Sequence, residues 1–144
     1  MLLKMRSLLL LIVGIISFSA TAQKAEFLQA GKYSAIMSDK NLCPNFTLVN
    51  EDFNDGNVTI AKQYNFILKN SKHLVESDID PSCQFKEINK IENKPDRTIL
   101  NRINEEYCSG KLRSKTNSEV EITKQEIKLR HQIDGAEINC LWKR

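Results

Sequence analysis

Four cysteines and two histidines are the residues best suited to chemistry in this chain of 144 residues. The cysteines follow one another at spacings of 40, 25 and 32 residues, so no Cys-x-x-Cys pair is present. A zinc site usually brings two of its ligands close together in sequence, and neither histidine has a neighbour at ligand spacing. An even number of cysteines without metal spacing favours two disulfides. The residues concerned are Cys43, Cys83, Cys108, Cys140, His73 and His131.

The N-terminal segment predicts the oxidising compartment that disulfides need. Lys4 and Arg6 precede a largely apolar run, Leu8–Ala20, and Ala20-Thr21-Ala22 gives the small-x-small pattern of a cleavage site. The alternative is a membrane anchor, but a run of 13 residues is short for a bilayer core that needs about 20. We expect a secretory signal peptide over residues 1–22 and one domain over 23–144. The protein is then secreted or periplasmic, without a membrane span.

The turn signals favour one of the three possible disulfide connectivities. Lys94-Pro95-Asp96 lies midway between Cys83 and Cys108, so a hairpin that reverses there places these two cysteines opposite each other. Cys43 then pairs with Cys140. The apolar spacing within Thr98–Tyr107 is closer to helical than to alternating, which leaves room for a bulge or for one short helix capped by Asp96.

The C-terminal end gives the clearest hairpin. Asp134-Gly135 is typical of a two-residue type I′ turn, and it pairs residues whose numbers sum to 269. Ile133 then lies opposite Ala136, and Ile127 lies opposite Trp142. The intervening pairs also place mostly apolar side chains on one face, so the turn and the hydrophobic pattern agree.

The rest of the chain indicates further strands at intervals of about 8–12 residues. Residues 58–68 carry apolar side chains on one face of a single long strand, interrupted only by Lys62. A turn is expected at Thr116-Asn117, and a change of phase at Thr123–Glu126 predicts a bulge or a bend. The fold class is therefore all-β: an antiparallel barrel or sandwich of about eight strands with two disulfides.

No catalytic motif is present, and the charge is nearly balanced. Phosphate-binding glycine loops, Gly-x-Ser-x-Gly and His-Glu-x-x-His are all missing from the sequence. The formal charge is +3, of which Lys4 and Arg6 contribute two, so the mature chain carries +1. A charge of +1 gives no general attraction to nucleic acid. We expect neither enzymatic activity nor a cofactor, a bound metal or a nucleic-acid partner.

The layout resembles the lipocalin-like (calycin) β-barrel proteins. It shares with them an exported chain of about this size and a Gly-x-aromatic near the first strand, here Gly31-Lys32-Tyr33 where that family has Gly-x-Trp. The resemblance implies a small apolar ligand held inside the barrel. Its lining would come from an inward row of side chains: Tyr64, Phe66, Leu129, His131 and Trp142. Alternatively, these side chains fill a small closed barrel.

Two other functions fit the same sequence. One is an exported protein-interaction module, such as a hydrolase inhibitor, because a rigid disulfide-braced scaffold lowers the ordering cost of the loops it presents. The other is a structural protein of the cell envelope without a small ligand. A ligand carrier predicts an interior cavity of roughly 300 Å³ or more. An interaction module predicts a filled core and an exposed anchor.

Overall fold

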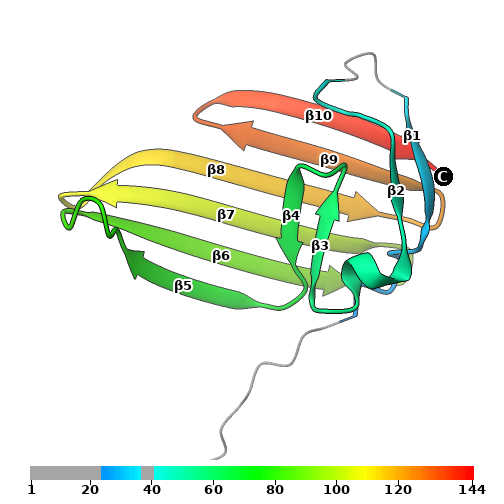
Figure 1. Ribbon diagram of the computed structural model, residues 1–144, viewed down its shortest axis with the longest axis horizontal. Coiled ribbons are helices and arrows are strands. Elements are labelled where there is room, and N and C mark those ends of the chain that lie inside the picture. The colour runs from blue at the N-terminus through cyan, green and yellow to red at the C-terminus, as the bar shows by residue number, and fades with distance from the viewer. Residues whose placement is uncertain (1–23, 37–40) are drawn as a thin grey trace, which may run out of the picture.

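The computed structural model describes residues 24–36 and 41–144, and it shows an all-β protein built on one large antiparallel sheet (Figure 1). The predicted signal segment lies outside the described residues. The large sheet has the strand order β2-β1-β10-β9-β8-β7-β6-β5, and β3 and β4 form a separate hairpin. The strands are β1 (Gly31–Ala35), β2 (Phe46–Leu48), β3 (Asn57–Ile60), β4 (Tyr64–Ile67), β5 (Ser71–Glu76), β6 (Cys83–Asn93), β7 (Thr98–Cys108), β8 (Lys111–Ile122), β9 (Glu126–Ile133) and β10 (Ala136–Lys143).

The fold class predicted from the sequence is confirmed: the protein is all-β and antiparallel, with an eight-stranded sheet and two disulfides. The sheet is open, and β2 and β5 are its edges. One short 3-10 helix, η1 (Asn50–Phe53), precedes β3. Both predicted hairpins are present with the expected registers. β9 and β10 pair with Ile133 opposite Ala136 and Ile127 opposite Trp142, while β6 and β7 reverse around Pro95.

Three local expectations were wrong. Residues 58–68 are two strands, because β3 and β4 turn back at residues 61–63, where Ala61 and Lys62 have positive φ angles of 53° and 59°. β8 runs unbroken through Thr116-Asn117. Residues 123–125 form the tight turn of the β8–β9 hairpin, in which the amide of Thr123 donates to the carbonyl of Glu126 at 2.9 Å. Of the two alternatives for the segment after Arg97, the structure has the bulge rather than the helix: β7 is a strand whose register with β8 shifts between Glu106 and Tyr107.

The hydrophobic core lies between the large sheet and the β3–β4 hairpin, which crosses one face of the sheet over β6, β7 and β8 (Figure 1). We call this face the inner face and the part of the sheet around the hairpin the proximal half. Alternation places the buried apolar side chains of the long strands on the inner face, while Ile88, Ile99, Ile103 and Leu141 lie half-buried on the other face. The side chains most completely buried there include Phe66, Leu100, Val120, Ile127 and Trp142.

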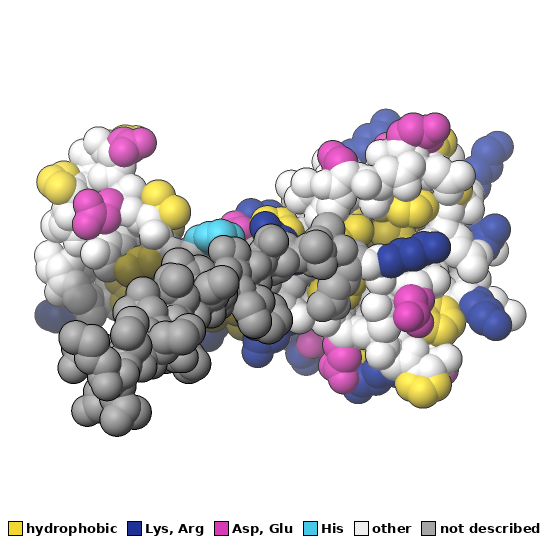
Figure 2. Space-filling model, turned by 90° about the horizontal axis from the view of Figure 1, so that it is seen from below, with side chains coloured by type: hydrophobic (Ala, Val, Ile, Leu, Met, Phe, Trp, Pro, Cys, Tyr) yellow, Lys and Arg dark blue, Asp and Glu magenta, His cyan; other side chains and the backbone are white. Residues whose placement is uncertain are grey.

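The strands continue well beyond the hairpin, and we call this part the distal half (Figure 1). It comprises β5 with the adjoining ends of β6, β7 and β8 and the tip of β9–β10. Its side chains are exposed or half-buried, except for Cys83 and Asn89. Figure 2 looks onto the molecule from the β5 side and shows apolar side chains at the surface of the distal end. The exposed apolar side chains of the distal end include Leu74, Val75, Ile79, Phe85 and Leu112, with exposed fractions of 45% to 96%.

The two disulfides stabilise opposite parts of the fold, and both predicted pairings are confirmed. Cys83 and Cys108 join paired residues of β6 and β7 at the distal end, with their Cα atoms 4.0 Å apart. Cys43 and Cys140 join the segment before β2 to β10, with Cα atoms 5.5 Å apart. No described cysteine is free.

Candidate functional site

A pocket of about 350 Å³ opens on the inner face at the boundary between the covered and the uncovered sheet. β4 provides one wall with Tyr64 and Asn65, and β7, β8, β9 and β10 provide the floor. The lining mixes apolar and polar side chains, as in most ligand sites. It consists of Leu42, Gln63, Tyr64, Asn65, Arg102, Asn104, Thr116, Ser118, His131, Ile133 and Ile138.

His131 and Tyr64 lie in contact in this pocket. Their ring centroids are 5.2 Å apart and the rings meet edge to face. Ser118 lies opposite His131 in the β8–β9 ladder, and its Oγ is 2.7 Å from the Nδ1 of His131. The Tyr64 hydroxyl donates to the carbonyl of Leu42 at 3.0 Å. Burial lowers the pKa of His131 from its ordinary value near 6.5 and so favours the neutral ring.

The charged groups beside the pocket neutralise one another. Arg102 donates to Glu87 at 2.7 Å and to the carbonyl of Asn65 at 3.1 Å, which ties the sheet to β4. Asn89 donates to the other carboxylate oxygen of Glu87 at 2.8 Å. Burial alone raises the pKa of Glu87, but the hydrogen bonds from Arg102 and Asn89 and the charge of Arg102 outweigh it and lower the pKa. Because Arg102 is paired, the pocket floor presents no strong net charge.

The structure brings together two of the five predicted lining residues and places the other three in the core. Phe66, Leu129 and Trp142 are at most 2% exposed and pack among other apolar side chains. Trp142 meets Phe46 edge to face with centroids 5.2 Å apart. These three side chains therefore fill the interior, which was the alternative left open by the sequence.

Several pocket residues were not predicted, although the sequence held a signal for one of them. Reading Thr123–Glu126 as a hairpin turn gives a register in which residue numbers sum to 249, and this places Ser118 opposite His131. Arg102 gives no such signal, because an arginine in a strand is usually a solvated side chain.

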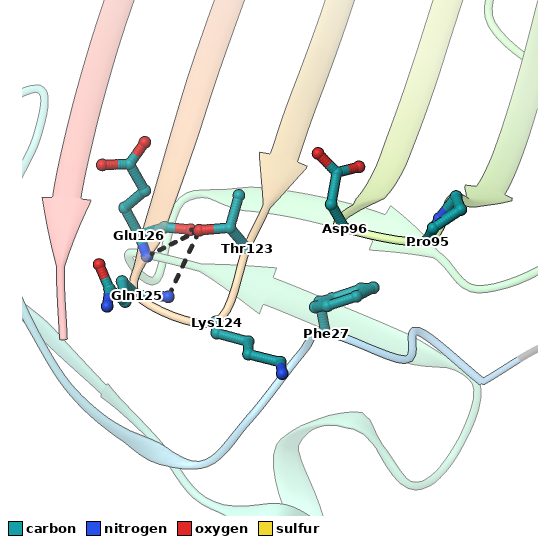
Figure 3. Close-up of a pocket in the computed structure, with 7 residues that line it drawn as sticks. All are labelled: Phe27, Pro95, Asp96, Thr123, Lys124, Gln125 and Glu126. Carbon is teal, nitrogen blue, oxygen red and sulfur yellow. Dashed lines mark hydrogen bonds between the residues drawn. The ribbon is translucent and has the colours of Figure 1, made fainter.

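A second hollow, of about 520 Å³, lies at the proximal end of the sheet between two hairpin turns (Figure 3). The Phe27 ring lies below the β6–β7 turn with Pro95 and Asp96, and Thr123, Lys124, Gln125 and Glu126 form the other side. Two of the polar side chains here already have partners: the Thr123 hydroxyl accepts from the amides of Gln125 and Glu126, and Asp96 pairs with Arg97 at 2.7 Å. This hollow is formed by two turns and the Phe27 segment, whereas the Tyr64–His131 pocket lies on the face of the sheet.

One group of described residues has metal-like spacing but not the chemistry. Cys83, Cys108 and Glu106 bring their sulfur and oxygen atoms within 4.8 Å of one another. Both sulfurs are consumed by the disulfide, so neither is a thiolate, the form in which cysteine binds metal. The group therefore gives no metal centre.

Comparisons with protein-family models, with curated proteins and with solved structures found no match to this chain. Across residues 24–36 and 41–144, the structure contains no helix of the length and hydrophobicity that crossing a membrane requires.

Proposed function

We propose that the protein is an exported interaction module that binds a segment of another polypeptide on the inner face of its sheet. The observation that carries this proposal is the uncovered inner face beside the Tyr64–His131 pocket. Beyond the hairpin, this face carries the exposed apolar side chains of Ile133 (43%), Phe85 (45%) and Val75 (60%). The two disulfides and the predicted signal segment support export.

The shape of this surface favours a polypeptide over a small molecule. The pocket is open, whereas small ligands are usually buried over most of their surface. From Arg102 to Glu106, which lies opposite Phe85, β7 extends about 13 Å, the length of four strand residues. A short extended segment can place one apolar side chain against Tyr64 and Ile133 and continue over Phe85. Anchors of this kind carry most of the affinity in protein interfaces.

A small-ligand carrier, as the lipocalin-like resemblance implies, is the second candidate. The pocket volume of about 350 Å³ supports it, because ligand sites begin near 300 Å³. In this alternative Tyr64 and His131 contact the ligand, while Phe66, Leu129 and Trp142 only support the pocket from below.

Selection from a displayed library of random peptides on the mature protein tests the proposal. We expect enriched peptides to contain an apolar anchor and to shift the NMR signals of Tyr64, His131 and Ile133. Ile133→Asp places a charge in the pocket floor and weakens the binding of these peptides about tenfold or more. The matched control is Val49→Asp, since Val49 is 48% exposed and is not among the residues that line the pocket.

Three outcomes contradict the proposal: no enrichment, enriched peptides that contact another surface, or equal affinity for Ile133→Asp. Native mass spectrometry separates the two candidates. A small molecule that accompanies the purified protein, and is lost from Ile133→Asp, favours the carrier.

A further inference from the structure

β5 is an edge strand whose backbone is available for pairing. It has a hydrogen-bonded neighbour, β6, on one side only among the described residues. Every residue from Lys72 to Glu76 is exposed, and Leu74 is 63% exposed. Edge strands in natural proteins are usually protected by charged side chains, proline, bulges or short length, and the charges of β5, Lys72 and Glu76, are of opposite sign. β5 has six residues, no proline and an uninterrupted register with β6.

The hydrogen bonds show which residues of β5 direct their backbone outward. The amide of Ser77 donates to the carbonyl of Cys83 at 3.0 Å, and the same register continues along β5 and β6. In an antiparallel ladder, hydrogen-bonded and non-hydrogen-bonded pairs alternate. The odd-numbered residues of β5 therefore bond to β6, and Lys72, Leu74 and Glu76 direct their N–H and C=O groups to the free edge.

This alternation restricts how two copies of β5 can pair about a two-fold axis. Even-numbered residues must lie opposite even-numbered residues, because only these direct their backbone groups outward. The register centred on Leu74 pairs all three outward residues with one another and forms six backbone hydrogen bonds. It places Leu74 opposite its own mate, and Lys72 opposite Glu76 of the other copy. Shifting the register by two residues places Leu74 opposite Lys72 or Glu76 and loses this charge match.

We propose that two copies of the protein pair through their β5 strands in this register, so that two eight-stranded sheets join into one. Two opposite-charge pairs, Lys72 with Glu76 and the reverse, flank the central Leu74 contact on the outer face. Opposite charges in directly facing cross-strand positions are stabilising, and like charges there are destabilising. The dimer goes beyond the proposed function, because it uses a sheet edge and leaves the Tyr64–His131 pocket open on each copy.

Sedimentation equilibrium of the mature protein tests this dimer, with circular dichroism to confirm that each variant is folded. We expect a dimer at about 100 µM, a concentration at which weak self-association is detected. Lys72→Glu and Glu76→Lys should each weaken self-association about tenfold or more, since each places like charges opposite each other twice. An equimolar mixture of these two variants restores every charge pair, so we expect it to form a heterodimer at the wild-type concentration.

A proline variant gives an independent test. Leu74→Pro removes an outward N–H and no bond to β6, a position at which edge strands tolerate proline. We expect a folded monomer. A wild-type protein that is monomeric at this concentration overturns the proposal, and so does a dimer that persists in Leu74→Pro or is not recovered in the mixture. Peptide binding by Ile133→Asp is measured separately, so failure of the dimer and failure of the proposed function are distinguishable.

Discussion

Truncation of Trp142 distinguishes a filled core from a ligand-lined cavity. The indole ring is 0% exposed, and its N–H donates to the carbonyl of Pro44 at 2.8 Å. Trp142→Phe keeps one aromatic ring but removes this donor. Pro44 is half-buried, so the lost hydrogen bond costs about 1 kcal/mol, and the space left by the smaller ring adds to that cost. We therefore expect Trp142→Phe to lower the free energy of unfolding by about 2–4 kcal/mol.

Urea denaturation followed by far-UV circular dichroism measures this loss, since the variant lacks the only tryptophan. The matched control is Phe85→Leu, because Phe85 is 45% exposed in the distal half. Surface changes of this kind usually alter stability by less than about 0.5 kcal/mol. A loss below about 1 kcal/mol for Trp142→Phe, with the urea dependence unchanged, would refute the packed-core interpretation. Trp142 would then be better explained as the wall of a cavity.

Two further predictions concern the disulfides and the response to pH. Replacing Cys43 and Cys140 by serine removes a link across 97 residues, and the chain-entropy model predicts that this lowers the free energy of unfolding by about 4.7 kcal/mol. Replacing Cys83 and Cys108, which are 25 residues apart, should lower it by less, about 3.5 kcal/mol, in the same urea assay. Burial lowers the pKa of His131 from 6.5, so the unfolded chain takes up a proton that the folded chain does not. Stability should therefore fall as the pH drops below about 6.5, and His131→Gln should reduce the difference between urea midpoints measured at about pH 7.5 and 5.5.

The sequence predicted those strand pairings in which a turn signal and a burial pattern coincide. Asp134-Gly135 and Pro95 each mark a turn, and the registers around them are as expected. The β3–β4 hairpin was missed for a physical reason. Val58 and Phe66 are paired residues, and paired residues face the same side, so one strand and a folded hairpin give the same apolar alternation.

The distal half was harder to predict because it carries no burial signal. Alternation appears only where one face is buried, and residues 111–117 of β8 are exposed or half-buried. Thr116-Asn117 therefore looked like a turn, although it continues the strand. The same limit applies to the candidate site: His131 and Tyr64 follow from apolar periodicity, whereas Arg102 lies beside them only because β4 crosses the sheet at that row.

The distal half persists without an apolar layer over it, and this explains several of its features together. Its strands are stabilised by backbone pairing, by the Cys83–Cys108 disulfide and by side-chain contacts along the outer face. There Glu105 lies 3.4 Å from the ammonium of Lys86 and 3.2 Å from that of Lys115. Ion pairs at the protein surface contribute little individually, so the disulfide is the stronger constraint. A sheet extended in this way at the expense of hydrophobic burial leaves an edge and an inner face accessible, which are the two surfaces that the proposed contacts require.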